Sequence, residues 1–431
     1  MLIVFGFLLA LSGTPDSLTS AAAPSDSVAV HGVAPAPRDY LAEMRANFTP
    51  ENRAYWQKRV ALAFIEPLVA ILVGALVLFT GLAARMRDVA IRLARSSWLQ
   101  LLIVLTLFTL VTIVLAFPLS WYSDYALEHH YGLSSQSFGG WLGDFLKEAL
   151  VGVFFLGVVP IVALAYSAIR KRRRWWLWMA IATLPLSVGA VLIQPLVVDP
   201  LFNQFKPLHD QHLKARILAL AERAGIPGRN VYEVDKSKQT RTYNAYVNGF
   251  GVSQRIVLWD TLLQGMKEDE ILFVMAHEMG HYKLAHIWKG ILASTIGGFL
   301  FFWLLFVVSR WAVRRYGNAW GFHELHDPAS LPLMLTLISL LVFVSEPISN
   351  GVSRAIENEA DVFALEITHD NDAGARTYLE LASQNKSNPE PPGWIRFVLY
   401  SHPTLSERVH RALSYHPWLE GKPNRFYRPG R

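Results

Sequence analysis

The sequence contains no cysteine among its 431 residues, so it can form no disulfide scaffold and can use no thiol chemistry. Charged residues are also scarce, at 17% of the chain against 52% hydrophobic residues, and no segment is repeated. The net charge of +6 does not indicate a nucleic-acid partner, because the basic residues stand in short clusters between apolar segments. We therefore expect neither a disulfide-stabilised fold nor nucleic-acid binding.

Long apolar segments, by contrast, are abundant, and the mean hydropathy is +0.27. Six runs reach the length of about 18 residues that a helix needs to cross a bilayer, and several have tryptophan near their ends. The sequence therefore predicts a mostly α-helical integral membrane protein in contact with the lipid bilayer. The six predicted spans are residues 61–84, 98–118, 149–169, 175–196, 289–309 and 331–349.

The N-terminus has a different pattern. Residues 1–23 have a short apolar core followed by small residues, ending at Ala21 to Ala23. This pattern is typical of a secretory signal peptide, and an uncleaved extra N-terminal helix is the alternative. Residues 24–60 form a polar segment of mixed charge that leads into the first span.

One polar motif, MAHEMGHYKLAH at residues 275–286, lies between apolar segments. His277, Glu278 and His281 match H-E-x-x-H, in which the two histidines lie on one face of a helix and can bind the same zinc ion. Glu278 then stands beside the metal, where a general base for a zinc-bound water is needed. A zinc site of this kind requires one further protein ligand from elsewhere in the chain.

That ligand does not come from the same segment. In the longer H-E-x-x-H-x-x-G-x-x-H pattern a glycine and a third histidine follow, but Leu284 and Ile287 stand at those positions. We therefore interpret His286 as an ordinary polar residue near the membrane surface. The third ligand is expected downstream.

A candidate occurs in SRAIENEAD, residues 353–361, where Glu357 and Asp361 are four residues apart. On one helix face Glu357 can bind zinc while Asp361 accepts a hydrogen bond from a ligand imidazole and fixes its orientation. Arg354 is expected to hold one of these carboxylates in a forked pair. A solvated acidic helix face is the alternative interpretation.

Together, HEMGH and SRAIENEAD resemble the type I CAAX prenyl endopeptidases, a family of membrane-embedded zinc metallopeptidases of the gluzincin kind. The segments YALEHHYGLSSQS, VVDPLFNQFKPL and NAYVNGFGVSQRIVLWDTLL also agree, in the right order, over about residues 120–415. The resemblance implies a bacterial-type relative with one zinc ion (Zn²⁺) per chain and a peptide or protein substrate, which in the family is prenylated. It also implies a ring of transmembrane helices around a water-filled chamber, with zinc at its wall.

The resemblance further implies residues that contact the substrate. In the family an Asn-Ala-Tyr strand lines the substrate site, which corresponds here to Asn244 and Ala245. The same segment has the Asn-Gly signal of a β-hairpin, between residues 243–247 and 255–259, and a purely structural hairpin is the alternative. The family often has a histidine two residues before that asparagine, where this chain has Thr242.

Near the C-terminus, SHPTLSERVHRAL places His402 and Arg408 at the spacing of a family His–Arg pair that closes over the zinc site. The resemblance implies that the pair stabilises the oxyanion formed when water attacks a carbonyl. A histidine–proline pair before a helix is also a common capping turn, which is the alternative for His402.

The motifs and spans together predict a division of the chain. We expect four spans within 61–197, the first half of a zinc metallopeptidase domain with a small β-hairpin or sheet in 198–288, two further spans in 289–350, and the third-ligand helix with the rest of the domain in 351–431.

Three functions fit this pattern. The first is a membrane-embedded zinc endopeptidase that resembles the protease removing the last three residues of prenylated CAAX proteins. The second is a quality-control protease that degrades misfolded membrane or exported proteins. The third, of another class, is a non-catalytic binding or transport protein with a structural zinc. Glu278 favours an enzyme, because a structural site has no need for a carboxylate beside its ligands.

Loop charges predict the orientation in the membrane. Loops one, three and five are short and basic, whereas loop 119–148 is acidic, so the basic loops should be cytoplasmic. The zinc domain should then face the periplasm of a bacterial inner membrane, opposite to the cytosolic orientation assigned to eukaryotic relatives. The basic residues are Arg85, Arg87, Arg92 and Arg95 in loop one, Arg170, Lys171, Arg172, Arg173 and Arg174 in loop three, and Arg310, Arg314 and Arg315 in loop five.

Overall fold

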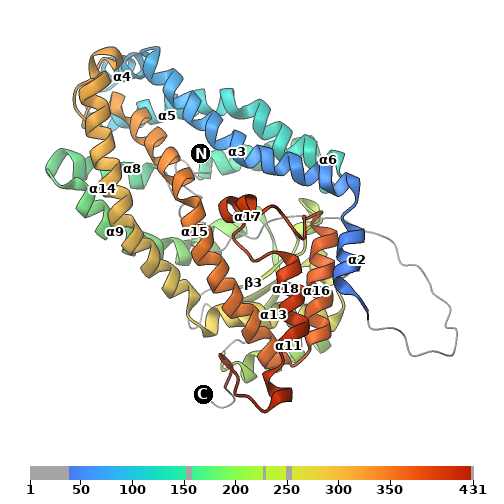
Figure 1. The fold of residues 1–431 in the computed structure, drawn as a ribbon. Helices are drawn as coiled ribbons and strands as arrows, with labels where there is room; N and C mark the ends of the chain where they lie inside the picture. The colour runs from blue at the N-terminus through green and yellow to red at the C-terminus, as the bar shows by residue number, and fades with distance from the viewer. Residues whose placement is uncertain (1–37, 152–157, 227–229, 249–254, 429–431) are drawn as a thin grey trace, which may run out of the picture.

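The computed structural model describes residues 38–151, 158–226, 230–248 and 255–428. The expected signal peptide, residues 1–23, lies outside the described residues. Most of the described chain is helical (Figure 1). Its helices are α2 (Tyr40–Asn47), α3 (Pro50–Phe79), α4 (Leu82–Leu93), α5 (Ser97–Trp121), α6 (Leu127–His130), α7 (Phe138–Leu150), α8 (Val158–Lys171), α9 (Trp175–Ile193), α10 (Asp199–Phe202), α11 (Gln211–Arg223), α12 (Asp260–Gly265), α13 (Glu268–Lys283), α14 (His286–Trp320), α15 (Leu331–Thr368), α16 (Asn371–Gln384), α17 (Gly393–Leu399) and α18 (Leu405–Ser414).

Five helical segments in the described part of the chain are long and apolar enough to cross a membrane. They contain four of the six predicted spans and overlap a fifth, 61–84, as far as Phe79, and they confirm a multi-pass, mostly helical membrane protein. The remaining predicted span, 149–169, includes residues 152–157, which lie outside the described residues, and α8 contains its second half. The five segments are Pro50–Phe79, Ser97–His130, Trp175–Phe202, His286–Trp320 and Pro328–Thr368.

The first of these helices, α3, begins earlier than its apolar run. The first backbone N–H groups of a helix have no acceptor within the helix. Here the Thr49 side chain accepts a hydrogen bond from the Asn52 amide, and Pro50, at the first helical position, has no N–H to satisfy. The polar residues 50–60 therefore form the first turns of α3. Further along, Leu68, Leu72 and Leu76 are exposed at helical spacing, which is the pattern of a lipid-facing stripe.

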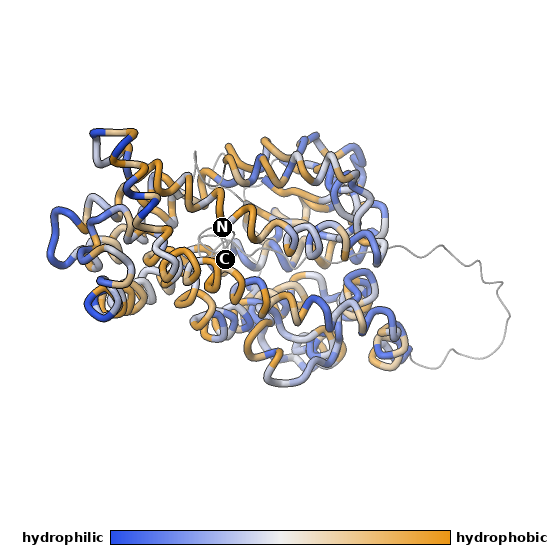
Figure 2. The backbone as a smooth tube through the Cα atoms, turned by 90° about the horizontal axis from the view of Figure 1, so that it is seen from above, coloured by the Kyte–Doolittle hydropathy of each residue, from blue (hydrophilic) through white to orange (hydrophobic). Residues whose placement is uncertain are grey.

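The helices are arranged in two parts. We call the small sheet, α11 to α13, the C-terminal turns of α15 and α16 to α18 the polar domain. In Figure 1, α3 and α5 run along one side of the molecule, α9 and α14 run along the other, and α15 extends between them into the polar domain. Figure 2 shows the apolar residues concentrated along the long helices and the hydrophilic residues in the connections and the polar domain.

The polar domain contains a four-stranded mixed sheet with the order β1-β2-β4-β3. The strands β2 and β4 are parallel, whereas β3 and β4 are antiparallel with Ala245 opposite Leu258. The predicted hairpin pairing is therefore confirmed, although its connection, residues 249–254, is not among the described residues. The strands are β1 (Phe205–Pro207), β2 (Val231–Val234), β3 (Ala245–Asn248) and β4 (Arg255–Trp259).

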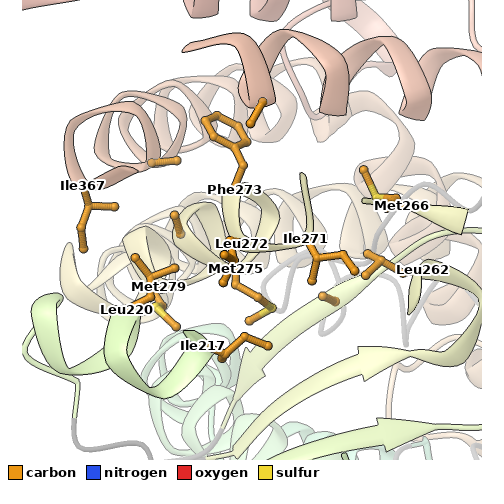
Figure 3. Packing of buried hydrophobic residues seen from close by; sticks show 14 of the residues in the cluster. Ile217, Leu220, Leu262, Met266, Ile271, Leu272, Phe273, Met275, Met279 and Ile367 are labelled. Atoms are coloured by element: carbon orange, nitrogen blue, oxygen red, sulfur yellow. The ribbon is translucent and has the colours of Figure 1, made fainter. Parts of the chain in front are cut away.

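Helix α13 lies at the centre of this domain and is buried on several sides. Figure 3 shows Ile217 and Leu220 of α11 facing Met275 and Met279 of α13. On the other side of α13, the Phe273 ring packs closely against Gly374 of α16. A Cβ on Gly374 would lie 2.8 Å from that ring. Because α13 is enclosed by the core, the side chains of the H-E-x-x-H motif have fixed positions.

Candidate metal centre

The H-E-x-x-H helix α13 crosses the helix α15, and a glycine lies at the crossing. A Cβ on Gly280 would stand 3.1 Å from Cδ1 of Phe363 and 3.2 Å from Cα of Ala360. The absence of a side chain at Gly280 thus lets the two backbones approach closely. Because the two helices are close, the motif histidines on α13 lie beside Glu357 on α15.

Three candidate ligands meet at this crossing. Donor atoms of His277, His281 and Glu357 all lie within 4.8 Å of one another. The Nε2 atoms of the two histidines are 3.1 Å apart, and Glu357 Oε2 lies 3.1 Å from His277 Nε2. Glu357 Oε1 is 3.5 Å from His281 Nε2. The structure therefore brings together the two motif histidines and the glutamate that the sequence predicted as their partner.

This donor set fits a zinc ion. Two nitrogens that bind one tetrahedral zinc at about 2.0–2.1 Å are about 3.3 Å apart, close to the separation of the two Nε2 atoms. Glu357 Oε2 is buried and, among the described residues, makes no well-aligned hydrogen bond even though two imidazoles are near it. A buried carboxylate oxygen of this kind is satisfied by a cation.

Asp361 lies behind His277 and fixes its ring. Asp361 Oδ1 is 2.9 Å from His277 Nδ1, and since a carboxylate only accepts, the Nδ1–H must donate. Burial alone would lower the pKa of His277, but the nearby carboxylates of Asp361 and Glu357 raise it to about 10 in the metal-free chain. In either protonation state Nδ1–H is committed to Asp361, so Nε2 is the atom left for a metal.

Asp361 is itself held by three side chains. Arg408 donates to both of its oxygens, at 3.0 Å from Nε and 2.6 Å from Nη2. Arg411 Nη1 donates to Oδ2 at 2.9 Å, and the Tyr378 hydroxyl donates to Oδ1 at 2.8 Å. Neither Tyr378 nor Arg411 was predicted from the sequence. The three-residue spacing of Arg408 and Arg411 on α18 would have placed both on one face.

Glu278 and His402 lie next to the three candidate ligands. Burial raises the pKa of the Glu278 carboxyl, and the neighbouring His277 and His281 oppose that shift. His402 Nε2 lies 3.3 Å from Glu357 Oε2, so the residue predicted from the C-terminal motif does reach the centre. Its Nδ1 is hydrogen bonded to the Ser401 hydroxyl at 2.9 Å, which orients the ring.

Arg354 does not hold a carboxylate of the centre, contrary to the sequence expectation. Its Nη1 donates to the backbone carbonyls of Arg396 at 3.1 Å and Tyr400 at 2.5 Å. The side chain therefore ties α15 to the end of α17 and the turn that precedes His402. The arginines that bond Asp361 are Arg408 and Arg411, from a segment that the local spacing around Arg354 could not reveal.

The interpretation of His286 as an ordinary polar residue was also wrong. Its side chain is buried, and its Nδ1 lies 3.0 Å from Nδ1 of His281. Its Nε2 lies 3.1 Å from Oε2 of Glu359, a residue that was not predicted as part of the site. His286 thus contacts a candidate metal ligand directly.

The predicted substrate residues lie on the sheet edge. Ala245 is buried on β3, and the Asn244 carbonyl accepts a hydrogen bond from the Trp259 amide at 3.0 Å. On its other side β3 has no strand partner within the described residues, and it packs against α13. Thr242 is buried, its hydroxyl is hydrogen bonded to that of Thr240, and its carbonyl accepts a hydrogen bond from the Thr261 hydroxyl. Its contacts here are therefore structural.

Comparison with known proteins places this geometry in a family. Residues 207–416 match the model of peptidase family M48, and residues 33–204 match the one described as CAAX prenyl protease N-terminal, five membrane helices. An uncharacterized metalloprotease of Bacillus subtilis, YhfN, is 36% identical over 304 residues, covering 70% of this chain and 71% of that protein. CAAX prenyl protease 1 of Saccharomyces cerevisiae is 30% identical over 333 residues, covering 73% and 72%.

A solved structure agrees with the sequence relatives. The crystal structure of Ste24p from S. mikatae superposes with a TM-score of 0.73 at 27% identity, over 86% of this chain and 89% of that one. The similarity extends through both the membrane helices and the polar domain, so it is not limited to the short metal motif. The chain belongs to peptidase family M48 and is a membrane metalloprotease that resembles CAAX prenyl protease.

Proposed function

We propose that this protein is a zinc endopeptidase in which His277, His281 and Glu357 hold one metal ion. The observation that carries the proposal is the convergence of these three donors beside a fourth group, Glu278, which is not needed as a ligand. A bound zinc would polarise the substrate carbonyl and acidify the attacking water. A non-catalytic protein with a structural zinc would have no use for Glu278.

The chain's own residues have distinct proposed roles. Glu278 takes a proton from the attacking water and delivers it to the leaving amine, for which its raised pKa is suited. His402, beside Glu357, donates a hydrogen bond to the oxyanion that develops on the carbonyl. Arg408 was expected to share that role, but its Nε and Nη2 donate to Asp361, and Nη2 also lies 3.5 Å from His277 Nδ1. We therefore propose that Arg408 positions His277, mainly through Asp361.

The substrate is proposed to bind as an extended peptide along β3. An edge strand offers unpaired backbone groups to a peptide, and β3 packs against the helix that bears the motif. Asn244 and Ala245 would then line the substrate backbone. The buried Thr242 replaces a histidine of the family pattern, so a contact made by that histidine is not available in this chain.

Two substrate classes follow from different observations. Relatives named CAAX prenyl protease 1 support cleavage of the C-terminal tripeptide from a prenylated CAAX protein. The loop charges, which predict a periplasmic zinc domain in a bacterial inner membrane, instead favour misfolded membrane or exported proteins. The proposed catalytic centre is the same in both cases.

One experiment tests the centre and separates the substrates. Purified protein would be incubated with a prenylated CAAX peptide, the same peptide without its lipid, and an unfolded membrane protein, each with and without chelator. We expect chelator-sensitive cleavage of at least one substrate, and cleavage by Glu278→Gln that is slower on the order of 10²-fold or more. Metal analysis of Glu357→Ala should show loss of the zinc that the unchanged chain retains at one ion per chain. Full zinc occupancy in Glu357→Ala would remove that residue from the ligand set.

A further inference from the structure

The two motif histidines differ in what holds their rings. The Nδ1 of His277 contacts the Asp361 carboxylate, which is held in place by hydrogen bonds from Arg408 and Arg411. His281 has no carboxylate against its Nδ1 among the described residues and meets another imidazole there, His286, at 3.0 Å. A metal-ligating histidine needs a partner for its second nitrogen, because that partner decides which nitrogen carries the proton.

The proton positions in this pair follow from Glu359. Glu359 Oε2 lies 3.1 Å from His286 Nε2 and accepts a second bond from Lys289 Nζ at 2.6 Å. A carboxylate paired with an ammonium is ionised and can only accept, so His286 Nε2 carries a hydrogen. The other tautomer would set a ring lone pair against the carboxylate, which is repulsive.

The hydrogen on His286 Nε2 also determines which ring nitrogen of His281 carries a hydrogen. A neutral His286 with its hydrogen on Nε2 has a lone pair on Nδ1, and this lone pair accepts the hydrogen of His281 Nδ1. His281 therefore keeps its own lone pair on Nε2, the atom that faces Glu357 and His277. The order Lys289, Glu359, His286, His281 fixes the tautomer that a metal requires.

The backbone is shaped to place His286 in this position. Ala285, which joins α13 to α14, has a φ of 56°, a left-handed conformation that residues with a side chain rarely adopt. The turn at Ala285 reverses the chain, so that His286, the first residue of α14, lies against His281 near the end of α13. His286 is only 4% exposed. The chain thus accepts an unfavourable backbone conformation where it brings the two imidazoles together.

We infer that His286 and Glu359 form a hydrogen-bond relay that positions His281 and sets its tautomer for metal binding. The inference rests on the proposed zinc site and adds two positioning residues to it. Outer partners of this kind contribute about 10- to 100-fold to metal affinity. The relay also ends at the domain surface, where Lys289 and Glu359 are partly exposed.

The test compares two substitutions of the same residue in the full-length protein in detergent. The asparagine of His286→Asn offers a carbonyl oxygen near the position of Nδ1 and can still accept from His281, whereas His286→Leu cannot. Zinc affinity is measured by competition with a chromophoric chelator, and the visible spectrum of the cobalt-loaded chain reports the geometry. We expect His286→Leu to weaken zinc binding by about 10- to 100-fold and to alter the cobalt spectrum, and His286→Asn to remain close to the unchanged chain.

A matched control and a second variant protect the test against misfolding. His326 also pairs with a glutamate, Glu324, at 2.7 Å, but on the exposed surface, so His326→Leu should change nothing. Glu359→Leu removes the far end of the relay at a partly exposed position and should weaken zinc binding without preventing folding. Thermal unfolding of the metal-free variants checks that each one is folded.

The outcomes are distinct. Equal zinc affinity in the unchanged chain, His286→Leu and Glu359→Leu would overturn the relay while leaving the proposed function intact. Equal loss in His286→Leu and His286→Asn would also overturn it, since it would assign His286 a packing role. If the unchanged chain bound no zinc and cleaved its substrates with chelator present, the proposed function would fail, and the relay would fail with it.

Discussion

At the scale of single residues, Glu278 separates metal binding from chemistry. Its carboxyl lies among the candidate ligands without being required as one, so Glu278→Gln should retain zinc and the shape of the centre. The amide cannot take a proton, and we expect turnover to fall on the order of 10²-fold or more. Peptide cleavage rates and metal content measured on one preparation check this, and retained activity would contradict the mechanism.

His277 gives a second residue-scale prediction, on pH. The nearby carboxylates of Asp361 and Glu357 overcome the effect of burial and raise its pKa to about 10 in the metal-free chain. Below that pKa a metal must displace a proton, so zinc affinity should rise with pH, by about tenfold per unit from this group. Chelator competition at several pH values measures the slope. Asp361→Asn should reduce it, whereas an unchanged slope in that variant would argue against the coupling.

What the sequence revealed at this scale depended on local spacing. His277 and His281 are one helical turn apart, as are Glu357 and Asp361, so their shared faces could be predicted without a fold. The partners of Arg354 and His286 could not. Arg354 bonds backbone carbonyls from a segment about 45 residues away in the sequence, and His286 turns back because of one left-handed residue, Ala285. Tertiary contacts of this kind leave no periodic signal in the sequence.

At the scale of elements, the close crossing of α13 and α15 decides whether the ligands meet. A Cβ at Gly280 would come within 3.2 Å of the Ala360 Cα, which is backbone and cannot rotate away. Gly280→Ala should therefore separate the helices slightly, destabilise the protein by about 1–3 kcal/mol and weaken zinc binding. Gly297→Ala, on the exposed face of α14 with nothing within 4 Å of the new carbon, is the control. Thermal unfolding and chelator competition measure both effects, and identical behaviour of the two variants would contradict this view of the crossing.

Element boundaries show how far apolar runs could predict the fold. Four predicted spans lie within long helices and a fifth, 61–84, overlaps one as far as Phe79, because bilayer length and hydropathy fix the minimum extent of such a helix. The same signal gave poor boundaries, since polar residues continue a helix once it has formed. Helix α3 starts at Pro50, eleven residues before its apolar run, and α15 continues past the membrane part to carry Glu357 into the polar domain. Hydropathy alone treats those two regions of α15 as separate.

At the scale of the whole molecule, the structure gathers the three basic loops at one end. Arg87 of α4 bonds Asp327, which follows α14, at 2.9 Å, and Arg170 of α8 bonds Ser97 at the start of α5 at 2.7 Å. Figure 1 shows α4 at the far end of the molecule from α13, α16 and α18. The basic end and the candidate metal centre therefore lie on opposite sides of the membrane part. Since short basic loops stay in the cytoplasm, the centre is expected on the periplasmic side.

Reporter fusions measure this orientation directly. Alkaline phosphatase is active only after export, so a fusion near Lys236 should be active and one near Arg172 inactive. That result would keep the centre away from prenylated proteins in the cytosol and would favour exported or misfolded membrane proteins as substrates. The reverse pattern would show that the basic loops do not set the orientation, and would bring the centre to the side where CAAX proteins are made. The fusions thus decide between the two proposed substrate classes without any assay of cleavage.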